Sequence, residues 1–512
     1  MPATSQRPDH TLFQATIGAG SALLLVLTFP KFSHFPLSAF ALVPLILAAV
    51  REPRSARRWL WGSLAGFLFF AGTCYWIYTV MRQYGGLGMV AAGGVLALLC
   101  LALSLYWGCF AWTAGRLWQV RWGPLAVPFV WVALELARAQ LLTGFPWLLL
   151  GYALTDYPSL ARVARWTGVY GLSFLLVCFN VAWAWILTRK DRAGVAFLGI
   201  ILAGTLGLFL TAPTETYSED RKAFLVQTNI PQEVGWQPWN LTTQGPLLDR
   251  LETLTTQAVG RQDPPALVIW PEMPASFYFH DDSFTREYAE GIARRTNSYF
   301  LTGIVAFVPG SRRTQPLNSE VLLDPSGRLL SQYDKIHLVP FGEYVPLKGW
   351  LWFAETLTAE SGDFVPGSRY VVTQLPEGRA SAFICYEAIF PDLVRRFVKE
   401  GAEVLVNISN DGWFGSSAAR YQHLLMARMR AIENARYLLR ATNTGLTVVI
   451  RPDGRIAGEI PPDRPAVLEA RWGFQSRQTF YSRHGDWFAY GSCLVAVAAL
   501  LAAGRRKRRE KE

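Results

Sequence analysis

Residues 381–387 read Ser-Ala-Phe-Ile-Cys-Tyr-Glu, and this stretch decides the fold of the polar part of the chain. A short apolar run leads to Cys385, and a helix is predicted to begin near Pro391. A cysteine at such a strand-to-helix turn is presented at the edge of a sheet, close to backbone N–H groups that can bind an oxyanion. By itself the pattern also fits a small cysteine packed in a core.

Two other segments carry a reactive side chain where a strand is expected to end. Residues 266–272, Ala-Leu-Val-Ile-Trp-Pro-Glu, end at Glu272. Residues 333–346, Tyr-Asp-Lys-Ile-His-Leu-Val-Pro-Phe-Gly-Glu-Tyr-Val-Pro, carry Lys335 near their start. Each residue alone has an ordinary explanation, a loop carboxylate for Glu272 and a solvated surface cation for Lys335.

The chemistry of a cysteine nucleophile explains why these three residue types belong together. Only the thiolate attacks, and a free cysteine is mostly protonated at neutral pH. A carboxylate such as Glu272 can take the thiol proton, and a cation such as Lys335 can stabilise a tetrahedral oxyanion. The three positions are far apart in sequence, so only folding can bring them together.

Short β-branched runs alternate with helical stretches between residues 213 and 485. We expect strands at 223–227, 266–270, 299–305, 320–323, 381–385, 403–408 and 446–450. We expect helices at 245–260, 283–296, 391–400 and 418–438. This alternation predicts a layered α/β domain over residues 213–485.

The rest of the chain is typical of a membrane protein. Hydrophobic residues make up 51% and charged residues 17% of the sequence, and the apolar residues crowd into residues 1–212 and one stretch near the end. A helix of about 20 apolar residues crosses a bilayer. On that rule we expect about eight spans, near 12–29, 36–50, 58–80, 87–113, 123–143, 166–188, 194–212 and 487–503. The predicted organisation is a membrane domain at 1–212, a soluble domain at 213–485, a last span at 486–504 and a basic tail at 505–512.

Basic clusters at 51–58, 189–192 and 505–509 flank these spans. We interpret them as cytoplasmic topology signals, which places both termini in the cytoplasm and the 213–485 domain in the periplasm of a bacterium. Arg162 and Arg165 are exceptions to this bias. The net charge of +11 does not indicate nucleic-acid binding, because no basic groove with interleaved aromatics accompanies the clusters.

Two features of the membrane part invite a functional interpretation. Glu135 and Arg138 lie inside the fifth predicted span and are expected to pair on one helix face, for packing or for binding a lipid headgroup. Residues 145–152 are predicted to lie at the membrane interface. Residues 349–353, Gly-Trp-Leu-Trp-Phe, are either core aromatics or an arm that dips into lipid.

The positions of the cysteines and histidines in the sequence argue against disulfide bonds and metal sites in the soluble domain. Five of the six cysteines lie in hydrophobic stretches, so Cys385 has no disulfide partner within the soluble domain. His337 and His423 lack metal-ligand spacing and are interpreted as structural. We therefore expect no metal and no organic cofactor.

The ordered trio of Glu272, Lys335 and Cys385, followed by residues 407–415, Asn-Ile-Ser-Asn-Asp-Gly-Trp-Phe-Gly, resembles the carbon–nitrogen hydrolase (nitrilase) superfamily. The resemblance implies a four-layer α-β-β-α sandwich and a Glu-Lys-Cys triad. Fusion to membrane spans, with the strings at 337–346, 144–147 and 227–232, narrows the resemblance to the apolipoprotein N-acyltransferase family.

The resemblance also implies roles for individual residues. Glu272 matches the general base, Lys335 the oxyanion-stabilising lysine and Cys385 the nucleophile. Glu343 and Glu387 match further acidic residues near the site, Tyr386 follows the nucleophile and offers its N–H to the oxyanion, and Trp236 matches a tryptophan of a substrate loop. Gly235 departs from the lysine found in many relatives, which puts a charged contact from that loop in doubt.

The reaction implied is acyl transfer in two steps through a thioester on Cys385. The donor is a phospholipid, phosphatidylethanolamine by family analogy, and the acceptor is the α-amine of a diacylglyceryl-modified N-terminal cysteine on an apolipoprotein. We expect a monomer in a bacterial inner membrane. The rivals are a membrane-tethered amidase, for which one anchoring helix would suffice, and a transporter or scaffold with an inert soluble domain.

Overall fold

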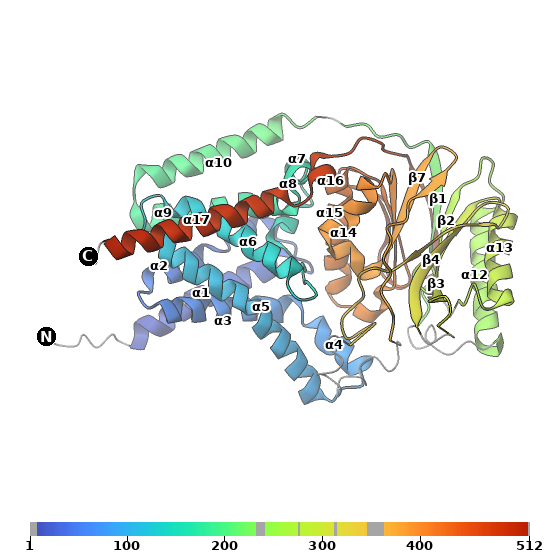
Figure 1. Cartoon of the computed structure of the whole chain (residues 1–512), viewed down its shortest axis with the longest axis horizontal. Coiled ribbons are helices and arrows are strands. Elements are labelled where there is room, and N and C mark those ends of the chain that lie inside the picture. The colour runs from blue at the N-terminus through green and yellow to red at the C-terminus, as the bar shows by residue number, and fades with distance from the viewer. Residues whose placement is uncertain are drawn as a thin grey trace. The chain divides into compact units, whose positions relative to one another are not determined.

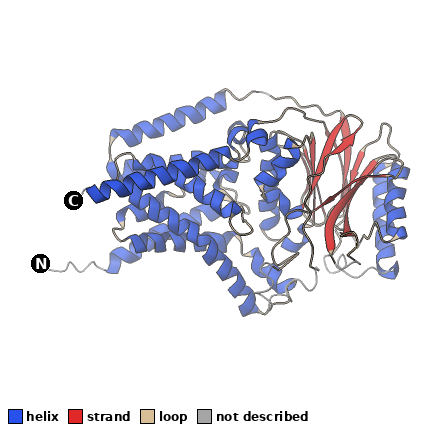
Figure 2. Cartoon of the chain, viewed as in Figure 1, coloured by secondary structure: helices blue, strands red, loops and turns tan. Residues whose placement is uncertain are grey.

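The computed structural model describes residues 8–213, 215–231, 241–274, 277–311, 315–345 and 363–509. By its internal contacts the chain divides into two compact units. The helical unit comprises Met1–Thr79, Gly88–Thr214 and His484–Glu512, and the α/β unit comprises Val80–Leu87 and Glu215–Arg483. Figure 1 labels the elements, and Figure 2 shows that the strands all belong to the α/β unit.

The α/β unit contains two six-stranded sheets among its described residues. The first sheet has the order β12-β1-β2-β3-β4-β5 and the second β11-β10-β9-β8-β7-β6. In chain order the strands are β1 Arg221–Gln227, β2 Leu267–Ile269, β3 Tyr299–Phe307, β4 Pro316–Leu323, β5 Leu329–Asp334, β6 Thr373–Leu375, β7 Gly378–Ile384, β8 Val404–Ser409, β9 Leu438–Thr442, β10 Thr447–Ile450, β11 Ile456–Ile460 and β12 Ala466–Trp472.

Helices cover the outer face of each sheet. The first sheet carries α12 (Leu241–Val259) and α13 (Ser283–Thr296), and the second carries α14 (Pro391–Lys399) and α15 (Ala419–Asn434) (Figures 1 and 2). The predicted α-β-β-α sandwich is therefore confirmed.

Parallel pairing places the reactive positions at sheet edges. In the first sheet β1, β2 and β3 are parallel, and in the second β7, β8 and β9 are parallel. The carboxyl ends of parallel strands meet at one edge of a sheet. Cys385 therefore follows β7 at the same edge at which Ser409 ends β8 and Thr442 ends β9.

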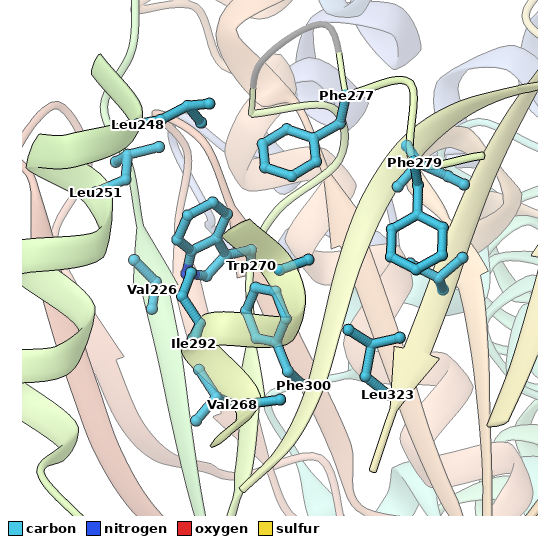
Figure 3. Packing of buried hydrophobic residues seen from close by; sticks show 14 of the residues in the cluster. Val226, Leu248, Leu251, Val268, Trp270, Phe277, Phe279, Ile292, Phe300 and Leu323 are labelled. Atoms are coloured by element: carbon cyan, nitrogen blue, oxygen red, sulfur yellow. The ribbon is translucent and has the colours of Figure 1, made fainter. Parts of the chain in front are cut away.

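A hydrophobic core anchors the strand that leads to Glu272. Trp270 is fully buried, and its ring meets those of Phe277 and Phe300 edge-on with centroids 6.1 Å and 5.3 Å away. Leu248 and Leu251 of α12 lie on the other side of the indole, as Figure 3 shows. Full burial of such side chains stabilises the fold by about 1.5–3 kcal/mol each, so the end of β2 is held in a fixed position.

The sequence missed one strand that matters for the site. A helix was expected over 418–438, but α15 ends at Asn434 because Ala435 takes a left-handed conformation (φ 49°). The chain then enters β9, which carries Arg440 into the second sheet. The expected strands near 223, 299, 381 and 403 and the helix at 283–296 are confirmed.

The helical unit contains fewer clear membrane spans than the eight expected. Among the described residues four helices are long and apolar enough to cross a membrane: α5 Met89–Leu117, α9 Val169–Arg189, α10 Arg192–Leu210 and α17, in its part Trp487–Arg505. A fifth results if α3 (Ser55–Thr73) and α4 (Trp76–Gln83), bent by 56° at their junction, form one span.

The remaining expected spans correspond to shorter or less regular helices. The apolar part of α1 (Pro8–Thr28) covers residues 13–28, and a second apolar helical stretch covers 35–51. Helix α6, Val127–Gln140, has 14 residues, or about 21 Å of rise against a hydrocarbon core of about 30 Å. Bends and short helices of this kind are not visible in composition, so the count of eight stays a prediction.

The two charged residues of α6 bind a neighbouring loop. Glu135 accepts a hydrogen bond from the Leu150 N–H at 2.7 Å, and Arg138 donates to the carbonyls of Phe145 and Trp147 at 2.9 and 2.8 Å. Both side chains are buried. They therefore hold the loop that follows α6 through its backbone, which is a packing role, one of the two roles expected for these residues.

Candidate active site

Glu272 lies just beyond β2 in a tightly packed turn. Its Oε1 accepts hydrogen bonds from Asn318 Nδ2 at 2.8 Å and Lys335 Nζ at 3.3 Å, and its Oε2 accepts one from the Asn410 N–H at 2.8 Å. A Cβ at Gly303 on β3 would lie 2.5 Å from the Met273 nitrogen, so glycine is needed there. The carboxylate is 4% exposed and fixed by donors from both sheets.

Lys335 is the first residue after β5, and its ammonium lies between two carboxylates. Nζ donates to Glu343 Oε1 at 2.8 Å and to Glu272 Oε1 at 3.3 Å. Burial alone would lower the pKa of Lys335, but the charges of Glu343 and Glu272 outweigh it and raise the pKa above its usual value. Lys335 is therefore a permanent cation inside the protein.

Asn318 on β4 is a site residue that the sequence did not reveal. Its Nδ2 donates to Glu272 at 2.8 Å and to Glu343 at 2.7 Å, so both amide protons hold carboxylates. Its backbone carbonyl accepts from the Lys335 N–H at 2.8 Å. A polar residue in a strand gives no local indication of such a contact. The burial of Asn318 becomes visible only in the folded structure.

Glu343 is held in the loop after Lys335. Its Oε1 accepts from Lys335 and Asn318, and its Oε2 accepts from the Val339 N–H at 2.7 Å. Phe341, two residues earlier, has a φ of 61°, a left-handed conformation that folds the loop back on itself. The three side chains Glu272, Lys335 and Glu343 therefore form one buried group with a net charge of −1 when all are ionised.

Cys385 opens a 3₁₀ turn, Cys385–Ile389, directly after β7. Its φ is 50°, and its side chain is 7% exposed. Burial and the negative charges of Glu272 and Asp411 raise the pKa of the thiol well above its usual value, against the opposing effects of Lys335 and Ser409. At neutral pH Cys385 is therefore a thiol whose proton must be removed before it can attack.

Glu387 joins the nucleophile turn to the segment that carries the lysine. Its Oε2 accepts from the Ile384 N–H at 2.7 Å. Its Oε1 accepts from the Tyr333 hydroxyl at 2.6 Å and from the N–H groups of Ile336 and His337 at 2.8 and 3.0 Å. Burial raises the pKa of Glu387, although these donors oppose the shift.

The structure places the other expected residues as follows. Tyr386 is buried beside the nucleophile, with its ring 5.2 Å from that of Phe390 and 6.0 Å from that of His337. Trp236 and the aromatic stretch 349–353 lie outside the described residues. The fold thus brings Glu272, Lys335, Glu343, Cys385 and Glu387 into one region at facing edges of the two sheets.

This arrangement suits a cysteine nucleophile with a paired base and cation. The charges of Glu272 and Lys335 act in opposite directions on the pKa of Cys385, Glu272 raising it and Lys335 lowering it. Among the described residues no group of three or more His, Cys, Asp or Glu side chains could hold a metal ion. The chemistry that the residues themselves support is nucleophilic attack on a carbonyl, with a carboxylate to carry the proton.

Comparisons with known proteins agree with this description of the domain. A family model described as "Carbon-nitrogen hydrolase" matches residues 223–478. An amidase from Nesterenkonia sp. aligns with 55% of this chain and 100% of its own, at 18% identity and a TM-score of 0.40. The family model alone assigns residues 223–478 to a carbon–nitrogen hydrolase domain.

The rest of the chain narrows the family. A model described as "Apolipoprotein N-acyltransferase N-terminal domain" matches residues 21–182. The apolipoprotein N-acyltransferase of Geobacter metallireducens is 38% identical over 99% of this chain and 98% of its own length. That of Methylococcus capsulatus is 34% identical over 95% and 97%. The chain belongs to the apolipoprotein N-acyltransferase family, and it is a membrane protein with several candidate spans.

Proposed function

We propose that this protein transfers an acyl chain from a phospholipid to the α-amine of the diacylglyceryl-modified N-terminal cysteine of an apolipoprotein. The observation that carries the proposal is the buried Lys335, set between Glu272 and Glu343 beside the Cys385 turn. Full-length similarity to apolipoprotein N-acyltransferases supplies the donor and acceptor classes. The donor proposed is phosphatidylethanolamine.

In the first step Glu272 takes the proton of the Cys385 thiol, and the sulfur attacks the ester carbonyl of the donor. The Lys335 ammonium and the Tyr386 N–H stabilise the oxyanion. Collapse breaks the ester C–O bond, and the lysophospholipid leaves as an alcohol after taking the proton back from Glu272. The product is a thioester on Cys385, and no oxidant or cofactor enters the balance.

In the second step the acceptor amine attacks the thioester carbonyl. Glu272 takes a proton from the amine, the tetrahedral intermediate collapses, and the C–S bond breaks to release the Cys385 sulfur, which recovers the proton. The product is an amide. Burial of Cys385, Glu272 and Lys335 supports transfer to an amine over hydrolysis, because water has little access to the thioester.

The proposed setting is the bacterial inner membrane. The α/β unit is proposed to lie in the periplasm, where the acceptor amine would reach it, with both termini in the cytoplasm and the protein acting as a monomer. The basic clusters that flank the apolar helices support this orientation.

Intact mass spectrometry tests the thioester. We expect the protein incubated with phosphatidylethanolamine alone to gain one acyl chain that hydroxylamine removes, and we expect Cys385→Ala to gain none. Conversion of lipoprotein substrate without any such adduct would refute the two-step mechanism. Hydrolysis of a small amide with no lipoprotein product would favour the tethered amidase.

A further inference from the structure

A second buried polar cluster lies next to the nucleophile turn, where His423 Nε2 is 3.1 Å from the Cys385 carbonyl oxygen. It consists of Ser409 and Asp411 after β8, Arg440 on β9 and His423 on α15, and none of these side chains is more than 1% exposed. The proposed mechanism uses none of their charges. Burying such groups is costly unless each is paired, so the cluster requires an explanation.

The ion pair at its centre is rigid. Arg440 Nη2 donates to Asp411 Oδ2 at 2.8 Å and Oδ1 at 3.0 Å, and the Ser409 hydroxyl donates to Oδ1 at 2.8 Å. Arg440 also donates through Nη1 to Asn407 Oδ1 on β8. Burial opposes ionisation of Asp411, but the charge of Arg440 holds the pKa of that carboxyl well below its usual range. The pair is therefore charged at every working pH.

His423 connects this ion pair to the nucleophile. Its Nδ1 lies 3.1 Å from Asp411 Oδ1 and 3.1 Å from Arg440 Nη2, and its Nε2 lies 3.1 Å from the carbonyl oxygen of Cys385. A carbonyl only accepts hydrogen bonds, so Nε2 carries a proton whether the ring is neutral or charged. The neutral form is favoured, because burial and the charge of Arg440 lower the pKa of His423.

The carbonyl that His423 binds belongs to a strained residue. A non-glycine residue in the left-handed region costs about 1–3 kcal/mol unless its surroundings hold it, and Cys385 has a φ of 50°. Glu387 holds the peptide between Phe383 and Ile384, one peptide earlier than the one before Cys385, through the Ile384 N–H at 2.7 Å. His423 holds the peptide after Cys385.

That second peptide also contains the N–H of Tyr386. In a planar trans peptide the C=O and the N–H point in opposite directions. A hydrogen bond that draws the Cys385 carbonyl toward His423 therefore directs the Tyr386 N–H away from His423. It also polarises the peptide and strengthens that N–H as a donor.

We propose that His423 is a positioning residue whose Nε2–H fixes the peptide between Cys385 and Tyr386, so that the Tyr386 N–H is presented to the oxyanion. The inference rests on the proposed function for the identity of the acyl donor. It assigns a task to a histidine that its sequence context marked only as structural. Asp411 and Arg440 hold the ring from behind.

The test compares His423→Leu with His423→Gln. Leucine fills the site without a donor, whereas a glutamine amide nitrogen reaches close to the position of Nε2 and can donate to the same carbonyl. His280→Leu is the matched control, because its ring bonds Gln332 on the surface. Each variant is assayed as the full chain in detergent.

Two reactions of the same thiol separate positioning from folding. Acylation by phosphatidylethanolamine or by a p-nitrophenyl ester forms an oxyanion, whereas alkylation by iodoacetamide forms none. We expect His423→Leu to slow acylation by about 10²-fold, the effect of losing an oxyanion donor, while alkylation changes less than about threefold. His423→Gln should recover most of the acylation rate.

Three outcomes decide the matter. Equal acylation by the leucine and glutamine variants would overturn the inference, and so would a parallel loss of acylation and alkylation. If wild type reacts with the p-nitrophenyl ester but never with phospholipid, the proposed donor is wrong. In that case the ester rates of the variants still decide the role of His423.

Discussion

The two sheets contribute different kinds of support to one site. The first sheet supplies Glu272 and Lys335, which with Glu343 form a buried group of three charges that bond one another side chain to side chain. The second sheet supplies Cys385, whose conformation is held mainly through its backbone, by Glu387 on one side and His423 on the other.

This difference separates two tasks. The first half of the site sets the charge that the thiol and the oxyanion experience, so its substitutions should act on rates and pKa values. The second half sets backbone geometry, so its substitutions should act on both stability and rate.

Replacing the buried cation should have the largest effect. Lys335→Met removes an oxyanion donor and leaves Glu272 and Glu343 facing each other without a counter-charge, so one of them must take a proton. We expect acylation of Cys385 to fall by about 10³-fold or more. Adduct formation on Cys385, measured by mass spectrometry, checks this rate.

The control is Lys222→Met, which removes a cation paired with Glu469 at the surface and should change the acylation rate little. A similar loss of rate in Lys222→Met would point to misfolding.

A substitution in the part of the site that belongs to the second sheet should lower the free energy of unfolding. Glu387→Gln replaces a carboxylate that accepts four hydrogen bonds with an amide whose NH₂ faces donors. We expect about 2–3 kcal/mol of lost stability, together with slower acylation and slower alkylation. Thermal unfolding and both thiol reactions measure this. Slower acylation at unchanged stability would remove the distinction between the two halves.

Charge substitution in the first half should move the thiol pKa in a defined direction. The charge of Glu272 raises the pKa of Cys385. Glu272→Gln should therefore lower that pKa, by about one unit or more, even though acyl transfer is lost. The pH dependence of iodoacetamide alkylation reports the shift. A midpoint that stays in place or rises would show that Glu272 does not act on the thiol.

The first sheet also holds a buried carboxyl whose Oε2 has no hydrogen-bond partner among the described residues. Glu320 on β4 is 3% exposed, and burial together with the charge of Asp334 raises its pKa to about 8. The unfolded chain releases this proton near the ordinary value of 4.5, so the folded state binds more protons between pH 4.5 and 8.

Stability should consequently fall as pH rises through this window and level off above it. We expect wild type to lose about 1 kcal/mol of stability between pH 6 and 7 through this group, and Glu320→Gln to lose less. Thermal unfolding at the two pH values measures the difference. Equal losses in the two proteins would mean that Glu320 is ionised in the folded state.

Much of the fold could be predicted from local sequence patterns. The apolar runs that end at Glu272 and at Cys385 gave strand ends, because side-chain periodicity and turn residues are local properties. The number of spanning helices could not be counted in the same way. The bend between α3 and α4 and the short α6 depend on how the helices pack, which apolar composition does not record.

The site was only partly predictable for a related reason. Asn318 and His423 have no local pattern that marks them, since their partners lie 25 to 46 and 12 to 38 residues away along the chain. Arg440 lies just beyond the helix expected over 418–438, in a stretch where no strand was expected.

The sequence alone determined the three reactive residue types, the strand ends that carry two of them, and the division into apolar and polar parts. Only the tertiary structure decided that Lys335 lies between two carboxylates and that His423 holds the Cys385 carbonyl. The physical reason is that strand and helix formation depends on neighbours in the chain, whereas buried charge pairing depends on which strands lie side by side and in what register.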